Sequence, residues 1–157
     1  MSLSRKILLV LAATLIVIQF FPARKNEPAV PPARGIEEVF PVPTDVAGLL
    51  RISCYDCHSN STRYPWYASI QPVGWWLSGH IEDGRNELNF EEFGSYELRR
   101  QERKFKEMEE MVTEDEMPLA SYTFIHRDAA LSSEQKSLLV AWTKAMRDSL
   151  APSGNGE

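Results

Sequence analysis

The stretch "CYDCHSN", Cys54–Asn60, holds both cysteines of this 157-residue chain and one of its three histidines. Two residues separate the thiols, and His58 follows the second thiol directly. This cluster decides how the rest of the sequence is interpreted.

Several chemistries compete for such a pair. A structural zinc site needs four nitrogen or sulfur ligands, but the other two histidines, His80 and His126, are scattered along the chain. A thioredoxin-type pair usually opens a helix after a strand, a context that this sequence does not show, and a plain disulfide is the simplest alternative. The spacing C-x-x-C-H is the signature of covalent haem attachment.

The physical reasons for that spacing are specific. Thioethers form with the two vinyl groups on one edge of the porphyrin, so the two sulfurs must lie one helical turn apart. The next residue then places its imidazole under the iron. We therefore predict one haem c bound through Cys54 and Cys57, with His58 as the proximal iron ligand.

A sixth iron ligand must come from farther along the chain, and Met117 is the best candidate. It lies in "EDEMPLASY", where Pro118 ends a helix and leaves the methionine free to approach the far face of the haem. A thioether opposite histidine suits electron transfer. The alternatives are His80, His126 or an open sixth position. The methionines on helical stripes are expected to fill the core: Met108, Met111 and Met146.

An aromatic-rich block, "YPWYASIQPVGWW", follows the motif. Its exposure to water would be costly, so we expect its members to wall the haem pocket together with a later tyrosine. The residues expected there are Tyr64, Trp75, Trp76 and Tyr122. Arg63 and Arg85 are candidates to pair with haem propionates, although solvation is the simpler expectation for each.

The pattern of apolar residues predicts an all-α domain. A first helix runs through "DVAGLLRISC", capped by Thr44 and Asp45, with a buried face predicted from its apolar spacing. That face comprises Val46, Leu49, Leu50 and Ile52. Pro72 opens a second helix through "VGWWLSGHIEDGRNEL".

Two further helices are predicted in the second half. The segment "SYELRRQERKFKEMEEMVTEDE" starts at a possible Ser95 cap, and its apolar stripe is Leu98, Phe105, Met108 and Met111 or Val112. Ser132 and Gln135 form a capping box that opens the last helix. One side of that helix carries Leu138, Leu139, Trp142 and Met146.

The N-terminus reads as an export signal. Arg5 and Lys6 precede an apolar run, Ile7–Phe21, and a basic segment before such a run is typical of secretory signals. Its 15 residues are fewer than the about 20 of a spanning helix. No cleavage pattern follows, so we favour an uncleaved anchor over a cleaved signal peptide.

Composition sets the expected organisation. Residues 1–25 form the signal peptide or membrane anchor, 26–43 a proline-rich linker, 44–150 the haem-binding domain and 151–157 a flexible tail. From residue 30 onward, 13 lysines and arginines face 21 acidic residues, a net charge of −8. This excess argues against nucleic acid as a partner and is compatible with a basic redox partner.

The blocks "CYDCHSNSTRYPWYASIQPVGWWLSGHIEDGRNELNFEEFG" and "EMPLASYTFIHRDAALS" resemble the exported haem-binding domain family of Bacteroidetes-type bacteria, which is related to c-type cytochromes. The resemblance covers about residues 49–142. It implies one covalent haem c at Cys54 and Cys57 with His58 as axial ligand. The Met-Pro pair resembles the distal-ligand segment of class I cytochromes c, which supports Met117. The helices at 44–53 and 133–150 are similar to the crossing first and last helices of such cytochromes.

The sequence therefore predicts a cytochrome-c-like electron carrier, not an enzyme, held on the periplasmic side of the inner membrane by its N-terminus. Its partners would be redox proteins. The main rival is a haem sensor or small peroxidase with an open or displaceable sixth site. A weaker one is an assembly module in which the haem is only structural.

Overall fold

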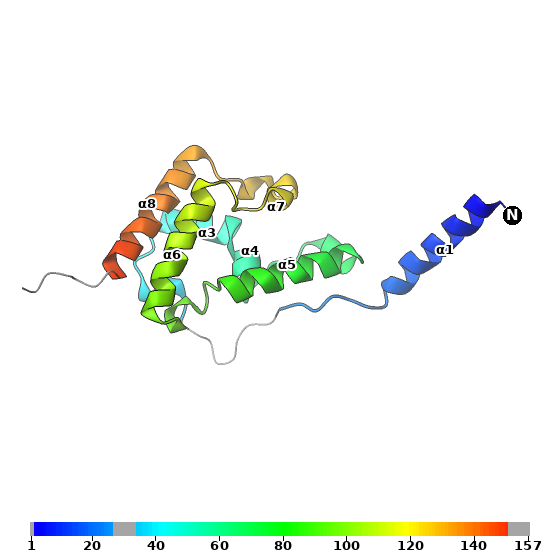
Figure 1. Ribbon diagram of the computed structural model, residues 1–157, viewed down its shortest axis with the longest axis horizontal. Coiled ribbons are helices and arrows are strands. Elements are labelled where there is room, and N and C mark those ends of the chain that lie inside the picture. Colours follow the sequence, from blue (N-terminus) through cyan, green and yellow to red (C-terminus); the bar gives the residue numbers. More distant parts are fainter. Residues whose placement is uncertain (1, 27–33, 151–157) are drawn as a thin grey trace, which may run out of the picture.

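Residues 2–26 and 34–150 are described by the computed structural model of the chain (Figure 1). Within these ranges every regular element is a helix, which confirms the predicted all-α class. The α-helices are α1 (Leu3–Ile18), α2 (Ile36–Val39), α3 (Thr44–Ser53), α4 (Tyr55–His58), α5 (Val73–Glu87), α6 (Leu98–Thr113), α7 (Ala120–Ile125) and α8 (Ser133–Leu150). Three short 3-10 helices are η1 (Trp66–Ser69), η2 (Phe93–Ser95) and η3 (Arg127–Ala129). The cytochrome-c-like arrangement stays a prediction.

The core of the domain lies where α6 packs along α8 (Figure 1). Phe105 of α6 is fully buried, and its ring contacts those of Phe40, Phe93 and Trp142 at centroid distances of 4.9–5.6 Å. Such aromatic pairs contribute about 0.5–1.5 kcal/mol each beyond the burial of their area. Helix α3 contacts α8 as well, so this core supports the segment that leads into the cysteine motif.

The predicted start of α8 is confirmed at its cap. The Ser132 amide donates to Oε1 of Gln135 at 2.8 Å, and the Gln135 amide donates to Oγ of Ser132 at 3.3 Å. Leu139 and Trp142 are buried as predicted, whereas Leu138 is 37% exposed. The capping box therefore fixes both the start of the helix and the face that it presents to the core.

The other helix predictions need small corrections. In α6, Phe105, Met108 and Val112 are buried as expected, but Leu98 is exposed because the helix begins there, and Ser95 belongs to η2. Glu97, not Ser95, precedes the first turn of α6.

Helix α3 has the predicted bounds but a narrower buried face. Pro43 precedes its first turn, and Asp45 accepts a hydrogen bond from the neighbouring Val46 amide. Val46 and Leu50 are buried, whereas Ile52 is 39% exposed. Ile52 lies two residues beyond Leu50, which turns it by about 200° to the opposite side of the helix.

Residues 34–43 correct the predicted linker. Ile36 is fully buried, its amide donates to the Phe90 carbonyl at 2.8 Å, and Phe40 packs against the core. The Gly94 amide donates to the Arg34 carbonyl at 2.8 Å. This segment contains one short helical turn, α2, between prolines. It buries a single side chain, and one apolar residue gives no periodic pattern from which a helix could be predicted. Residues 27–33 of the expected linker and the tail 151–157 lie outside the described residues.

Helix α1 has 16 residues and buries none of its side chains. No helix in residues 2–26 and 34–150 combines the length and apolar character that crossing a membrane requires. The chain beyond α1 returns to the domain, where Gln19 and Gln71 exchange two hydrogen bonds of 2.9 and 3.0 Å.

Replacing Ile36 by alanine tests whether residues 34–43 belong to the core. Because Ile36 is fully buried, Ile36→Ala should lower the free energy of unfolding by about 2–5 kcal/mol, measured by urea denaturation. Ile125→Ala removes the same atoms from a side chain that is 58% exposed and should have a much smaller effect. Equal effects of the two substitutions would mean that the segment is a linker after all.

Candidate functional site

The cysteine motif forms a single helical turn. Helix α3 ends at Ser53, Cys54 joins it to α4, and the His58 amide donates to the Cys54 carbonyl at 3.0 Å. Both thiols are half-buried and neither forms a disulfide. The two cysteines and His58 therefore share one turn, as the spacing predicts.

His58 is oriented by the end of α5. Its Nδ1 lies 2.9 Å from the Gly84 carbonyl oxygen and 3.0 Å from that of Leu88. Because carbonyl oxygens only accept hydrogen bonds, Nδ1 must carry the ring proton, which leaves Nε2 with a free lone pair. Burial lowers the pKa of His58 from its ordinary value of 6.5, which favours the neutral imidazole. A neutral ring with Nδ1 held by a carbonyl is the usual state of a metal-binding histidine.

The approach of α5 to the motif requires a glycine. A Cβ atom on Gly84 would lie 2.9 Å from the Cys57 carbonyl oxygen and 3.3 Å from the Cys57 Cβ. Only a residue without a side chain therefore lets the Gly84 carbonyl reach His58. Gly79, five residues earlier on the same helix, has no atom within 4 Å of its ideal Cβ position.

The two thiols are not activated nucleophiles. Burial raises the pKa of Cys54 to about 12 and that of Cys57 to about 11. Redox-active and zinc-binding cysteines act as thiolates, and their pKa is usually lowered by nearby positive charge. The surroundings of this pair favour neither chemistry.

Two cavities meet at His58. The first, of about 320 Å³, extends toward α6 and α8, and the second, of about 340 Å³, extends along α5. Both volumes fall within the range of ligand sites, about 300–1,000 Å³. The walls common to both are Ser53, Cys54, His58, Glu87, Met117 and Pro118. The apolar lining of the first cavity is Leu88, Phe90, Met108, Met111, Val112, Leu131 and Leu139.

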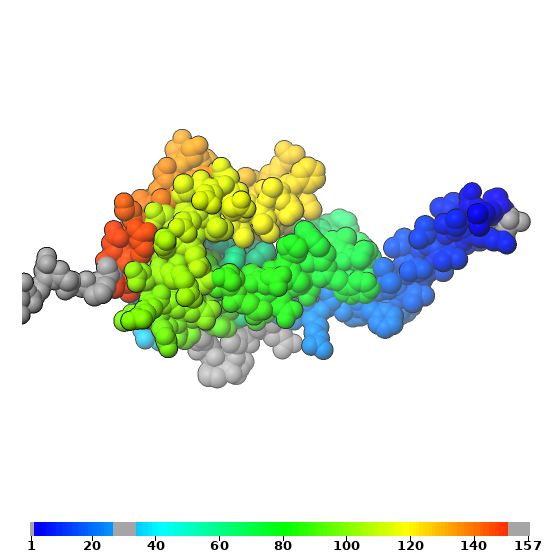
Figure 2. Space-filling model, in the orientation of Figure 1, coloured from blue at the N-terminus to red at the C-terminus, as the bar shows by residue number. Residues whose placement is uncertain are grey.

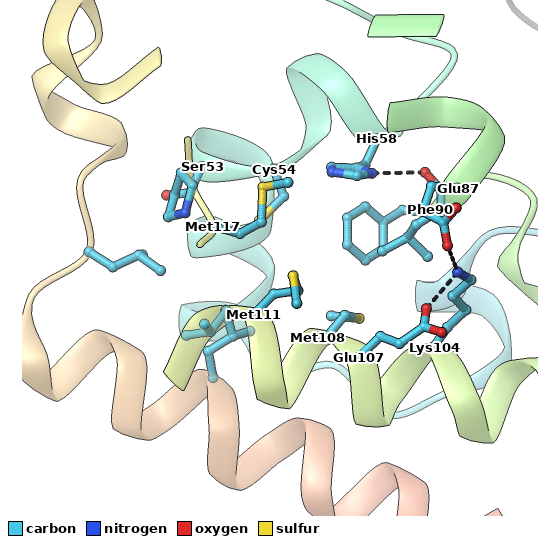
Figure 3. Close-up of a pocket in the computed structure, with 15 residues that line it drawn as sticks. Ser53, Cys54, His58, Glu87, Phe90, Lys104, Glu107, Met108, Met111 and Met117 are labelled. Carbon is cyan, nitrogen blue, oxygen red and sulfur yellow. Dashed lines mark hydrogen bonds and ion pairs between the residues drawn. The ribbon is translucent and has the colours of Figure 1, made fainter. Parts of the chain in front are cut away.

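Met117 is brought to these cavities by the end of α6. Asp115 adopts a left-handed backbone, with φ of 61°, a conformation that aspartate tolerates better than most residues. The amides of Glu116 and Met117 then both donate to the Met111 carbonyl, at 2.9 and 3.1 Å. Cys54, His58 and Met117 all line both cavities, and Figure 3 shows one edge of the His58 ring directed toward the side of the cavity that holds the other two. The distal-ligand candidate and the proximal histidine thus share both cavities.

Two methionines expected to be core filler, Met108 and Met111, also line the first cavity (Figure 3). Both belong to α6, and Met108 is 8% exposed. Their apolar stripe therefore serves the core and the cavity at once. A thioether in such a position is an alternative to Met117 that the sequence did not raise.

Tyr122 of α7 lines the second cavity and is bonded to the motif itself. Its hydroxyl donates to Oδ2 of Asp56 at 2.8 Å, and Arg63 Nε donates to Oδ1 at 3.1 Å. Burial and the bond to this carboxylate raise the pKa of Tyr122. Asp56, between the two cysteines, therefore anchors α7 over the motif. Arg63, considered for a propionate, is engaged here, and Arg85 lines neither cavity.

Three aromatic residues correct the predicted pocket wall. The Tyr64 hydroxyl donates a hydrogen bond to the Asn26 side chain, and the Trp75 indole donates one to the Phe21 carbonyl. The side chain of Trp76 is 51% exposed. None of the three lines either cavity. The face of α5 that meets the second cavity consists of His80, Asp83, Gly84 and Glu87, at helical spacing. Trp76 precedes this row by one turn, and Trp75 lies on another face.

The two remaining histidines differ in position. His80 lines the second cavity, and its Nδ1 lies 3.0 Å from the Trp76 carbonyl, so it stays an alternative iron ligand. His126 lines neither cavity. Its Nε2 is 2.7 Å from the Tyr67 hydroxyl and its ring stacks on Tyr122 at 4.5 Å.

An ion-paired cluster at the edge of the first cavity was not predicted. Lys104 is 4% exposed and contacts both Glu87 and Glu107 (Figure 3). The ammonium of Lys104 lowers the pKa of Glu87 through their hydrogen bond. Lys104 precedes Met108 by four residues and Met111 by seven, which places it on the same face of the helix. This spacing could have identified Lys104 as a buried lysine that needs acidic partners.

The arrangement fits a haem. An apolar cavity adjoins an imidazole whose Nε2 is free, two unactivated thiols lie on the same helical turn, and Met108, Met111 and Met117 line the same cavity. Histidine and methionine are both established ligands of haem iron. His58 would hold the metal, while Cys54 and Cys57 would anchor the porphyrin edge.

Gly84→Ala tests whether the close approach of α5 orients His58. The added methyl group meets the Cys57 backbone, so this variant should lose about 1–3 kcal/mol of stability and load less haem per chain. Gly79→Ala, at the open position on α5, should instead be neutral or gain up to about 1 kcal/mol from helix propensity. Urea denaturation and the pyridine haemochrome assay measure the two effects. Parallel behaviour of the two variants would refute the packing argument.

Comparison with known protein families gives a match to a domain family. The haem-binding domain family matches residues 13–145, a span that contains the motif, both cavities and most of the packed helices. No curated protein and no solved structure matches the chain at a significant level. With the family matching well over half of its length, the chain belongs to the haem-binding domain family.

Proposed function

We propose that the chain carries one haem c, attached by thioethers to Cys54 and Cys57, with His58 Nε2 as the proximal ligand. The observation that carries this proposal is the pair of carbonyl oxygens, Gly84 and Leu88, that hold the proton on Nδ1 of His58. The C-x-x-C-H spacing supplies the covalent part of the proposal. The unactivated thiols are compatible with a structural attachment rather than with thiol redox chemistry.

The proposed activity is transfer of single electrons, without catalysis of a reaction by the chain itself. A bound haem supplies a one-electron couple between ferric and ferrous iron. His58 and Met117 would occupy the two axial positions and leave none for a substrate. The apolar side chains of the first cavity exclude water, which favours the reduced state and raises the reduction potential.

We also propose that the chain acts outside the cytoplasm, at the periplasmic side of the inner membrane. Arg5 and Lys6 followed by the apolar residues 7–21 support export, and haem c is attached outside the cytoplasm. Helix α1 would remain as the anchor, and the partners would be a membrane-side donor and a periplasmic acceptor of electrons. The acidic domain, with a net charge of −8 from residue 30 onward, would attract a basic partner.

The position of Met117 also favours one rival function. It lies on an irregular segment after α6, so a ligand exchange at this position needs no helix to move. A haem sensor or small peroxidase would use such a displaceable ligand. Carbon monoxide added to the reduced protein distinguishes the two functions, because a firmly held sixth ligand prevents ready binding.

Met117→Ala tests the sixth ligand. We expect this variant to keep its haem, to lose the weak far-red absorbance of a sulfur–iron bond, and to bind carbon monoxide readily. Met111→Ala is the matched control, because Met111 also lines the first cavity but lies within α6. It should keep the far-red band.

Four results would contradict the ligand assignment or the proposed function. Loss of the band in Met111→Ala alone would make Met111 the ligand. A far-red band that persists in both variants would favour Met108, which lines the same cavity, and a spectrum without the band in the unaltered protein would favour His80. Ready binding of carbon monoxide by the unaltered protein would contradict electron transfer through a closed site and favour the sensor or peroxidase.

A further inference from the structure

Exposed apolar side chains gather at the N-terminal end of α5 and in the neighbouring helix η1. Three of them are tryptophans, a residue rarely left in water because of its large apolar ring. We call this group the collar; it consists of Trp66, Ile70, Val73, Trp75 and Trp76, whose exposed fractions are 78%, 44%, 40%, 41% and 51%. The fourth tryptophan, Trp142, is 6% exposed in the core.

The N-terminal end of α5, which carries part of the collar, lies beside the chain that follows α1 (Figure 1). The Trp75 indole donates to the Phe21 carbonyl at 2.8 Å, and Ser78 Oγ donates to the Arg24 carbonyl at 2.7 Å. In Figure 2 the surface of α5 is continuous with that of the chain that follows α1. Phe21 at this contact is itself 63% exposed, so exposed apolar residues of the N-terminal segment adjoin the collar.

A buried amide holds the two parts together. The Gln71 amide donates to Oε1 of Gln19 at 2.9 Å, and Gln19 Nε2 donates to the Gln71 carbonyl at 3.0 Å. Gln71 is 2% exposed, and its own side chain accepts a bond from the Trp75 amide at 3.1 Å. Helix α1 is thus joined to the collar by hydrogen bonds, not only by a length of linker.

The chemistry of this surface matches a lipid interface. Tryptophan is enriched where membrane hydrocarbon meets water, because its ring is apolar and its N–H is polar. Arg24 and Lys25 follow the collar contacts of Phe21, in a chain whose remainder from residue 30 is acidic. Basic side chains at this depth favour anionic lipid headgroups.

We infer that the collar is a lipid-contacting surface, which lies in the interfacial region of the bilayer that receives α1. This inference rests on the anchoring part of the proposed function and goes beyond it, because it assigns a membrane contact to the haem domain itself. The occupant is the lipid bilayer, with its aromatic-rich contact made by Trp66, Trp75 and Trp76.

The collar also fixes how far the haem site lies from the membrane. Trp75 and Gly84 belong to the same helix, α5, and are nine residues apart, or about 14 Å at 1.5 Å per residue. Gly84 holds the proximal histidine at 2.9 Å. Helix α5 therefore acts as a spacer that keeps the site near the membrane surface, within reach of a membrane-bound electron donor.

The test uses the full haem-loaded chain with phosphatidylcholine vesicles whose acyl chains are brominated, since bromine quenches only indoles that touch lipid. Vesicle flotation first establishes binding. We expect most of the tryptophan emission to be quenched relative to vesicles of ordinary lipid. A variant with Trp66→Phe, Trp75→Phe and Trp76→Phe keeps only Trp142, and its quenchable emission should fall several-fold while flotation is retained.

Other results would overturn the inference. Flotation without quenching would mean that α1 enters the bilayer alone. This result would support the anchor and refute the lipid contact of the collar. Emission that depends on protein concentration but not on brominated lipid would assign the collar to a second copy of the chain. Failure to float would refute both the collar and the anchor. Haem content, measured on the same samples, would still report independently on the haem part of the proposed function.

Discussion

The hydrogen bonds from His58 Nδ1 to the carbonyl oxygens of Gly84 and Leu88 are the interaction on which the site depends. They join the turn that carries both cysteines to the end of α5, and they settle which ring nitrogen is free. Their geometry requires α5 to approach Cys57 closely, which Gly84 permits. These contacts therefore orient the His58 ring, so that the imidazole presents Nε2 to the cavities rather than to solvent.

The helices divide the remaining tasks. The core between α6 and α8, centred on Phe105 and Trp142, supports one side of the first cavity and also places Met108 and Met111 on its wall. The end of α6 returns the chain so that Met117 meets the same space. Asp56 holds α7 over the motif through Tyr122. Helix α5 links the histidine at one end to the collar and α1 at the other.

The sequence predicted what is encoded locally. The C-x-x-C-H spacing placed Cys54, Cys57 and His58 on one turn, as the structure has them, and the helices at 44–53 and 133–150 followed from periodicity and caps. The acceptors of His58 are backbone carbonyls, which leave no mark in a sequence. An aromatic-rich stretch reveals neither which face of α5 meets the cavity nor at which turn the cavity ends, so Trp75, on another face, and Trp76, one turn too early, were misplaced. The single buried side chain of Ile36 was hidden among prolines, and Lys104 was hidden among the many charges of α6.

The mass of the intact protein, produced in a host competent for cytochrome maturation, tests the central claim most directly. The account predicts a denatured chain heavier by one haem, with neither Cys54 nor Cys57 open to alkylation. A polypeptide mass without the adduct, together with two alkylated cysteines, would contradict the covalent attachment and the role assigned to the motif.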